Sequence, residues 1–166
     1  EPIGNNDYKP SVARWNMATG EINPMPYEYP DLKKVRFIYA ASAEHQLYVQ
    51  CYTQYDLMTI CDFNGNLKCN IYGPKWVNEK TQTQHYSLGV EFCGDKILAL
   101  YSGGDHRTDA YYPTKFLVFD LNGNYLKTLE TGYMITDFCY DKENNRLIIN
   151  LNDEIQFAYL DLEGII

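Results

Sequence analysis

Residues 57–73, LMTICDFNGNLKCNIYG, decide the fold, because residues 116–132, FLVFDLNGNYLKTLETG, repeat their pattern. A third, shorter copy, FAYLDLEGII, occupies residues 157–166, and a looser copy lies at residues 12–22. Each of the first three copies has an apolar run, an Asp and then a tight turn that contains Gly. Asn-Gly between two apolar runs is a strong signal for a β-hairpin, because both residues tolerate positive φ. The copies therefore predict a series of antiparallel hairpins.

The segments that precede these hairpins repeat as well. Leu47, Ile97 and Leu147 begin equivalent apolar runs, and each run follows another strand and a polar turn. One unit therefore has four strands. Short strands with frequent turns, and no amphipathic helical runs, indicate a sandwich, a barrel or a propeller. A four-stranded unit that repeats at about 40–50 residues favours the last of these. We predict an all-β fold of repeated four-stranded antiparallel blades, a partial β-propeller.

The whole chain, 1–166, is predicted to be a single propeller segment. Residues 1–22 supply the last two strands of one blade, 35–72 and 86–130 form complete blades, and 135–166 form a partial blade of three strands. Propellers usually have at least four blades, which is about sixteen strands. Thirteen strands make only a piece of a ring, and three explanations stay open. The chain belongs to a longer protein, two copies associate to complete one ring, or an open array blocks its edges in another way.

The charge and hydropathy of the chain exclude several classes of partner. It has 22 acidic and 14 basic residues, a net charge of −8, and its Lys and Arg residues are scattered. A nucleic-acid binder has a basic patch or stripe, so we expect no nucleic-acid partner. The apolar runs are far shorter than the roughly 20 residues of a membrane span. No charged segment followed by an apolar one begins the chain, so we see no signal peptide.

The cysteines give no framework for a metal or for disulfides. There are five, an odd number, and none of them has short paired spacing. We interpret them as unpaired thiols that pack as small apolar residues, with one disulfide as the alternative in an exported protein. The three His residues lack zinc spacing. We therefore expect no metal and no cofactor.

Three stretches in order carry a resemblance to a known family. They are ILALYSGG at 97–104, FLVFDLNGNYLKTLET at 116–131 and LIINLNDEIQFAYLDL at 147–162. The set resembles the TolB-like six-bladed β-propeller proteins of Bacteroides-type bacteria, over about four-fifths of the chain from Val35 onward. The resemblance implies a six-bladed ring and a protein of the bacterial cell envelope, in the periplasm or at the surface. It implies no activity. The chain has about half the length expected for the family, and no lipid-attachment Cys begins it.

Two connections between strands are longer than their counterparts in the other units. Each of them, 73–85 and 102–114, has about eight extra residues. In a blade whose strands run up and down, both connections fall at the same face. Loops on a rigid scaffold are where binding residues concentrate. We therefore place the candidate site at this long-loop face.

The long connections contain seven candidate ligand-binding residues: Trp76, His85, Asp105, His106, Arg107, Tyr111 and Tyr112. The Trp and Tyr rings offer surfaces on which a sugar can stack. Trp76 has an alternative role, which is to cap the core between blades. Asp105, His106 and Arg107 form an acid–base pair, an anion clamp or simply a solvated polar loop, and His85 is also interpreted as an ordinary residue at the start of a strand.

No catalytic motif is complete. The segment that begins at Asp62 resembles the start of a calcium loop, but its Gly and Glu positions do not fit, so it is interpreted as a turn. The Ser102-Gly103-Gly104 sequence lacks the strand–turn–helix context of a nucleophile elbow. The sequence therefore favours a non-enzymatic binding or interaction module whose ligand is a glycan, a peptide or a protein. One alternative is a fragment of a propeller enzyme, such as a glycoside hydrolase or lyase, with Asp105 and Asp109 as the local carboxylates. The other is a purely structural half-domain.

Overall fold

The computed structural model describes residues 12–25, 32 and 35–166. Over these residues the chain forms thirteen strands and one short 3-10 turn, η1 (Asp109–Tyr111). The predicted all-β fold is therefore confirmed. Half of the first predicted segment, residues 1–11, lies outside the described residues, as do residues 26–31 and 33–34.

The strands form four antiparallel sheets. The N-terminal hairpin consists of β1 (Ala13–Trp15) and β2 (Ile22–Pro24). The first sheet consists of β3 (Phe37–Ser42), β4 (Leu47–Tyr52), β5 (Leu57–Asp62) and β6 (Leu67–Tyr72). The second sheet consists of β7 (Thr83–Cys93), β8 (Lys96–Asp105), β9 (Lys115–Asp120) and β10 (Tyr125–Glu130). The third sheet consists of β11 (Ile135–Asp141), β12 (Arg146–Leu151) and β13 (Phe157–Asp161).

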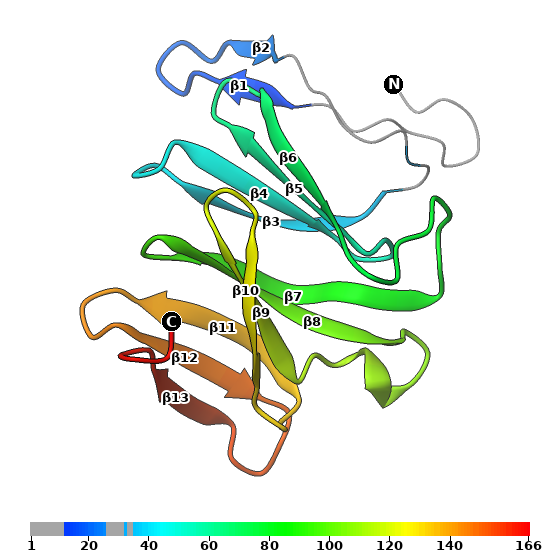
Figure 1. The fold of residues 1–166 in the computed structure, drawn as a ribbon. Coiled ribbons are helices and arrows are strands. Elements are labelled where there is room, and N and C mark those ends of the chain that lie inside the picture. Colours follow the sequence, from blue (N-terminus) through cyan, green and yellow to red (C-terminus); the bar gives the residue numbers. More distant parts are fainter. Residues whose placement is uncertain (1–11, 26–31, 33–34) are drawn as a thin grey trace.

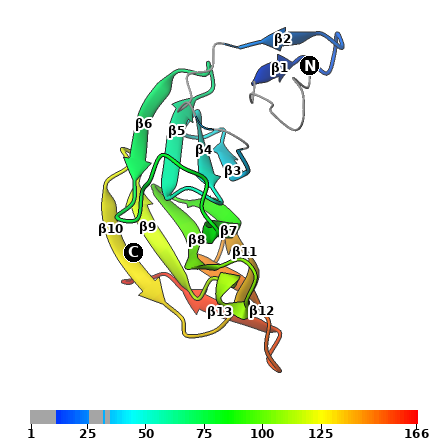
Figure 2. The same ribbon diagram turned by 90° about the vertical axis from the view of Figure 1, so that its right-hand side faces the viewer.

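The three larger sheets stack face to face like the blades of a propeller (Figure 1). Within each sheet the strands follow one another in chain order. The first strands, β3, β7 and β11, come together along one side, where β7 contacts both of the others. The fourth strands, β6 and β10, lie at the opposite side of a curved stack (Figure 2). This arrangement of consecutive four-stranded units is the predicted blade architecture.

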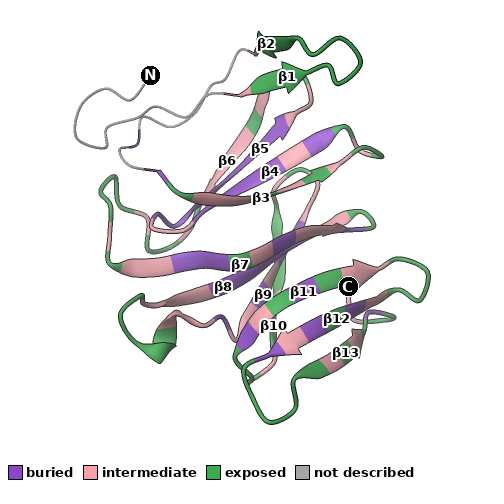
Figure 3. Cartoon of the chain, turned by 180° about the vertical axis from the view of Figure 1, so that it is seen from behind, coloured by how far each residue is buried: buried purple, intermediate pink, exposed green. Residues whose placement is uncertain are grey.

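The core lies between the sheets, and β8 is buried on both faces. Successive side chains of a strand point to opposite sides. Ile97 and Ala99 therefore pack toward the first sheet, whereas Leu98 and Leu100 pack toward the third. All four side chains are fully buried, and Figure 3 shows buried residues along the middle strands of the blades. This double burial explains why residues 97–101 of β8 are a continuous apolar run.

Two hairpin turns have the same hydrogen bonds, as their repeated sequence requires. The Asp62 carboxylate accepts hydrogen bonds from the backbone N–H groups of Asn64 and Asn66, at 2.8 and 2.9 Å. Asp120 accepts the equivalent pair in the second sheet, both at 2.9 Å. The glycines of these turns have φ of +88° and +85°, which favours glycine. The segment at Asp62 is therefore a β-turn, as the sequence indicates.

The second sheet begins earlier than predicted. Its first two strands have 11 and 10 residues, against six in each of the corresponding strands of the first sheet. The additional pairs include Thr83 with Asp105 and Gln84 with Gly104. Part of each long connection is therefore β-strand, and only residues 73–82 and 106–114 remain as loops. These pairs lengthen the open end of the β7–β8 hairpin, away from its turn, beyond the ends of the neighbouring strands.

Candidate functional site

The two long connections lie at the same end of the molecule, on the right-hand side of Figure 1. They contact each other directly. The backbone N–H of His106 donates to the carbonyl oxygen of Gln82 at 3.2 Å, and the His106 ring Nδ1 lies 2.9 Å from the same oxygen. Because a carbonyl oxygen only accepts hydrogen bonds, Nδ1 carries the proton. His106 thereby connects the β8–β9 loop to the β6–β7 loop.

Arg107 is held by its neighbour Asp105. The guanidinium donates from Nη2 to Asp105 Oδ2 at 3.1 Å and from Nε to Oδ1 at 3.3 Å. The hydrogen bonds from Arg107 lower the pKa of the Asp105 carboxyl. Asp105 is therefore ionised at neutral pH. The geometry therefore shows a closed ion pair on the surface between Asp105 and Arg107.

Tyr111 and Tyr112 stack on each other at the end of η1. Their ring centroids are 4.2 Å apart, and the rings are inclined by 30°. The turn is fixed to β8, because the Ser102 hydroxyl donates to the carbonyl oxygen of Ala110 at 2.7 Å. Both Tyr residues are half-buried. They offer part of an aromatic surface in the same loop as His106.

Trp76 packs on the first sheet. Its ring lies edge-on to Tyr72, with centroids 4.8 Å apart, and 6.2 Å from the ring of Tyr55. It borders a small core cluster that includes Tyr52 and Leu57. The indole is half-buried, so it covers the edge of the core and leaves a limited surface for a ligand.

His85 is buried rather than exposed, and it belongs to a polar cluster between the first two sheets. Its Nδ1 lies 3.3 Å from the Tyr101 hydroxyl and 3.7 Å from Oδ1 of Asp56. Asp56 follows β4 and is also buried. Its other oxygen, Oδ2, accepts a hydrogen bond from the backbone N–H of Lys75 at 2.9 Å. The cluster therefore fastens the β6–β7 loop to the β4–β5 turn.

The cluster holds His85 in its neutral form. Burial lowers the pKa of His85, Asp56 opposes this effect, and Lys75 adds to it. Burial also raises the pKa of Tyr101. Within the described residues, Nε2 of His85 and Oδ1 of Asp56 are buried without a hydrogen-bond partner. Such a cluster is sensitive to any change that adds charge to it.

This arrangement predicts that the protein loses stability as the pH falls. The folded state keeps the pKa of His85 below its ordinary value of 6.5. At pH values just below 6.5, the unfolded chain therefore binds a proton at this residue more readily than the folded protein does. Stability therefore rises with pH there and is lost on acidification. We expect the free energy of unfolding in urea to drop between pH 7 and pH 5. The drop should be smaller in His85→Gln, and an equal slope in both proteins would contradict the assignment to His85.

Sequence reasoning did not find Asp56 or Tyr101. The candidates came from the two connections of unusual length. Asp56 sits in a short β4–β5 turn and Tyr101 in an apolar run, so neither was among them. The available signal was an acidic residue directly before the apolar strand β5, at the same face as the long loops. An Asp beside a buried strand needs a partner, and the His at the start of the next unit supplies it.

A separate hollow of about 300 Å³ opens at this end between the first two sheets. It is lined by Arg36, Thr53, Gln54, Lys80, Gln84 and His106. Of these residues only His106 was predicted from the sequence. Lys80 and Gln84 also lie in the lengthened connection 73–85, whereas Arg36, Thr53 and Gln54 lie beside β3 and in the β4–β5 turn, which no insertion marks. The predicted site residues are thus divided: His106 lines the hollow, His85 is buried beneath the loops, and the others do not line the hollow.

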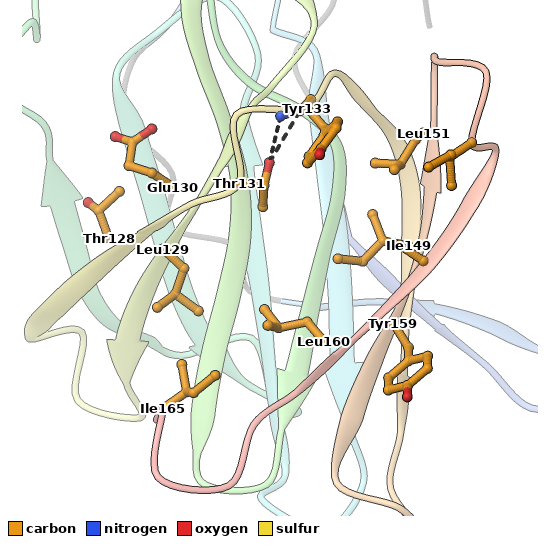
Figure 4. A pocket seen from close by; sticks show the side chains of 12 residues that line it. Thr128, Leu129, Glu130, Thr131, Tyr133, Ile149, Leu151, Tyr159, Leu160 and Ile165 are labelled. Carbon is orange, nitrogen blue, oxygen red and sulfur yellow. Dashed lines mark hydrogen bonds between the residues drawn. The ribbon is translucent and has the colours of Figure 1, made fainter.

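Two larger cavities lie between successive sheets and occupy equivalent places. The first, of about 340 Å³, includes Leu117 and Phe119 of β9 in its lining. The second, of about 600 Å³, is lined by Ala158 and Leu160 of β13. Leu117 and Ala158 each lie three residues before the Asp of their turn, and Phe119 and Leu160 each lie one residue before it. These Asp residues are Asp120 and Asp161. Figure 4 shows the second cavity, with Leu129 and Ile165 opposite Ile149 and Leu151.

The two cavities differ because the second sheet has a fourth strand and the third sheet does not. In the first cavity, Tyr125 and Thr128 of the fourth strand β10 close one side. Among the described residues no strand pairs with the outer edge of β13. The larger volume is therefore the space that the side chains of a fourth strand would fill.

The open edge of β13 predicts self-association of this 166-residue chain. Unpaired edges recruit other strands, and a charged side chain on the edge opposes this pairing. We expect sedimentation velocity to show a larger species as the protein concentration rises. Phe157→Lys, which changes an exposed residue of β13, should shift the transition to a higher concentration. Met17→Lys, far from β13 in the N-terminal hairpin, serves as the control. A monomer at all concentrations would contradict this prediction.

Comparisons with known proteins agree with the propeller architecture. No protein-family model and no curated protein matches the sequence. The hydrazine synthase of Kuenenia stuttgartiensis has a similar structure, with a TM-score of 0.60 and 12% identity over 93% of this chain and 40% of that chain. A chain of a nidogen/laminin complex gives a TM-score of 0.59 and 12% identity over 92% of this chain and 52% of that chain. At this identity the likeness shows a β-propeller-like fold alone, and the chain spans about half the length of these structures or less.

Two further findings concern the part of the chain that the structure describes. No helix there is long and apolar enough to cross a membrane. No group of three or more His, Cys, Asp or Glu side chains gathers there in a way that could hold a metal ion.

Proposed function

We propose that this chain is a non-enzymatic binding module and that it holds its ligand at the long-loop face. The observation that carries the proposal is the direct contact between the two lengthened connections. His106 binds Gln82 across them, and buried Asp56 fixes the base of the β6–β7 loop through the hydrogen bond from the Lys75 N–H. Binding sites on loops depend on such a rigid support. The proposed ligand is a glycan, a peptide or a protein, and the resemblance of the sequence to envelope propellers supports a place in the bacterial cell envelope.

The state of Asp105 supports binding over glycoside hydrolysis. The general acid of a glycosidase needs a raised pKa, so that it is protonated at neutral pH. Arg107 has the opposite effect on Asp105, because its hydrogen bonds lower the pKa of that carboxyl. Asp105 is therefore a poor proton donor, which weakens the only local carboxylate pair proposed for an enzyme.

Calorimetry with a panel of glycans and peptides tests this function. Any ligand found is then titrated against Trp76→Ala, which changes a half-buried residue of the first connection, and Arg107→Ala, which changes an exposed residue of the second. We expect at least one of them to weaken binding about tenfold, as loss of a charge-assisted or aromatic contact does. Tyr39→Ala, an exposed residue of β3, is the control. Unchanged affinity in both variants would move the site to another face.

A further inference from the structure

The hollow beside His106 concentrates basic side chains in an acidic protein. Arg36, Lys80 and His106 line it, and the chain as a whole has a net charge of −8. Among the described residues no carboxylate belongs to the lining, and neither Arg36 nor Lys80 forms an ion pair. The Asp105 carboxylate lies 3.7 Å from His106 Nδ1 but is bound by Arg107. The hollow is thus locally positive.

The remaining lining is polar and neutral. Thr53 contributes a hydroxyl, and Gln54 and Gln84 contribute amides. Such groups hydrogen-bond to hydroxyl or amide groups of a ligand. The volume of about 300 Å³ is at the lower end for small-molecule sites, which run from roughly 300 to 1,000 Å³. A group of about the size of one sugar residue fills it.

The segments that carry this lining are fastened to one another by backbone hydrogen bonds. Thr53 N–H donates to the carbonyl of Arg36 at 3.0 Å, which joins the β4–β5 turn to the start of β3. The Thr81 N–H and hydroxyl both donate to the carbonyl of Gln54, at 3.3 and 3.2 Å, which joins the β6–β7 loop to the same turn. The basic groups therefore project from a fixed frame, and a ligand need not order it on binding.

We propose that this hollow binds a sugar-sized ligand that carries a carboxylate or a phosphate. Arg36 and Lys80 hold the anionic group, Arg through a planar fork that matches two oxygens and Lys as a point charge. Thr53 and Gln84 bind the neutral part. The overall negative charge of the protein repels anions at long range, so specific anion binding needs a local site of this kind. This inference rests on the proposed binding function and adds the chemical class of the ligand.

The test uses the full chain and three probes. Sodium glucuronate and inorganic phosphate supply the two oxyanions, and glucose is the neutral control. We expect glucuronate to bind more tightly than glucose, and phosphate to compete with it. Arg36→Gln and Lys80→Gln should each weaken glucuronate binding about tenfold, the cost of one charge-assisted hydrogen bond. Neither side chain has a hydrogen bond within the described residues, so both variants should fold; circular dichroism verifies this.

Lys68→Gln is the matched control. Lys68 is an exposed residue of β6 outside the lining of the hollow, so this substitution removes the same charge elsewhere. An equal loss in Lys68→Gln would overturn the proposal, because the attraction would then be diffuse. Absence of glucuronate and phosphate binding would also overturn it. If a neutral ligand from the panel still binds, and its affinity depends on Trp76 or Arg107, only the proposal of an anionic ligand is rejected and the proposed binding function stands. If nothing binds at this face, the proposed function fails as well.

Discussion

Replacement of Gly104 by alanine is expected to dislodge η1 and the loop that carries His106 and Arg107. A Cβ atom at Gly104 would lie 1.9 Å from the carbonyl oxygen of Ala110 and 2.5 Å from its carbonyl carbon. Both are backbone atoms, so no side chain can turn aside to make room. The turn must move away from β8, and the hydrogen bond from Ser102 to Ala110 is then lost. We expect a loss of about 2–4 kcal/mol in the free energy of unfolding, within the range of overpacking mutations.

Limited proteolysis locates this effect. Arg107 lies in the displaced loop, so trypsin should cleave after it much faster in Gly104→Ala than in the unaltered protein. Gly132→Ala is the control, because Gly132 has open space around its Cβ position and only the left-handed φ of +75°. That change costs about 1–2 kcal/mol by backbone strain alone. A stable Gly104→Ala protein with an unchanged cleavage rate would show that η1 does not pack on β8 in this way.

The fold was predictable because its main signals are local. Asp62 and Asp120 each begin a turn whose hydrogen bonds lie within four residues, so the sequence repeat carries the whole geometry. The apolar run at β8 likewise reflects burial on both faces. These features repeat with the unit, and they placed the strands in groups of two, four, four and three.

The site was less predictable because its contacts are distant in sequence. Asp56 and His85 are 29 residues apart, and neither position is unusual in its own segment. The extension of β7 and β8 depends on pairing Thr83 with Asp105, which are polar residues without an alternating pattern. Loop length predicted that the two long connections lie at the same end of the molecule, and they do. It did not show that His85 turns inward, or that Arg36, before the first sheet, joins His106 at one hollow.

Gly73 and Asp56 are expected to depend on each other, and a double-mutant cycle measures this. A Cβ atom at Gly73 would lie 2.2 Å from both Cγ and Oδ1 of Asp56. The carboxyl group is buried and held by the Lys75 N–H, so it cannot swing away freely. Gly73→Ala should therefore cost about 2–4 kcal/mol of stability. Asp56→Ala should cost about 1–3 kcal/mol, because the part-buried Lys75 N–H loses the hydrogen bond that it donates to Asp56.

The double variant shows whether Gly73→Ala destabilises the protein by a steric clash with Asp56 or by a general weakening of the loop. Once Asp56 is alanine, the atoms that collide with a Cβ at Gly73 are gone, and Gly73→Ala should then cost much less. We expect the two changes together to cost at least about 1 kcal/mol less than their sum, as contacting residues usually couple. Urea unfolding of the four proteins at pH 7 gives the coupling, with Lys68→Gln as a surface reference. Strict additivity would mean that the loop does not lie against Asp56, and the support proposed for the long-loop face would be lost with it.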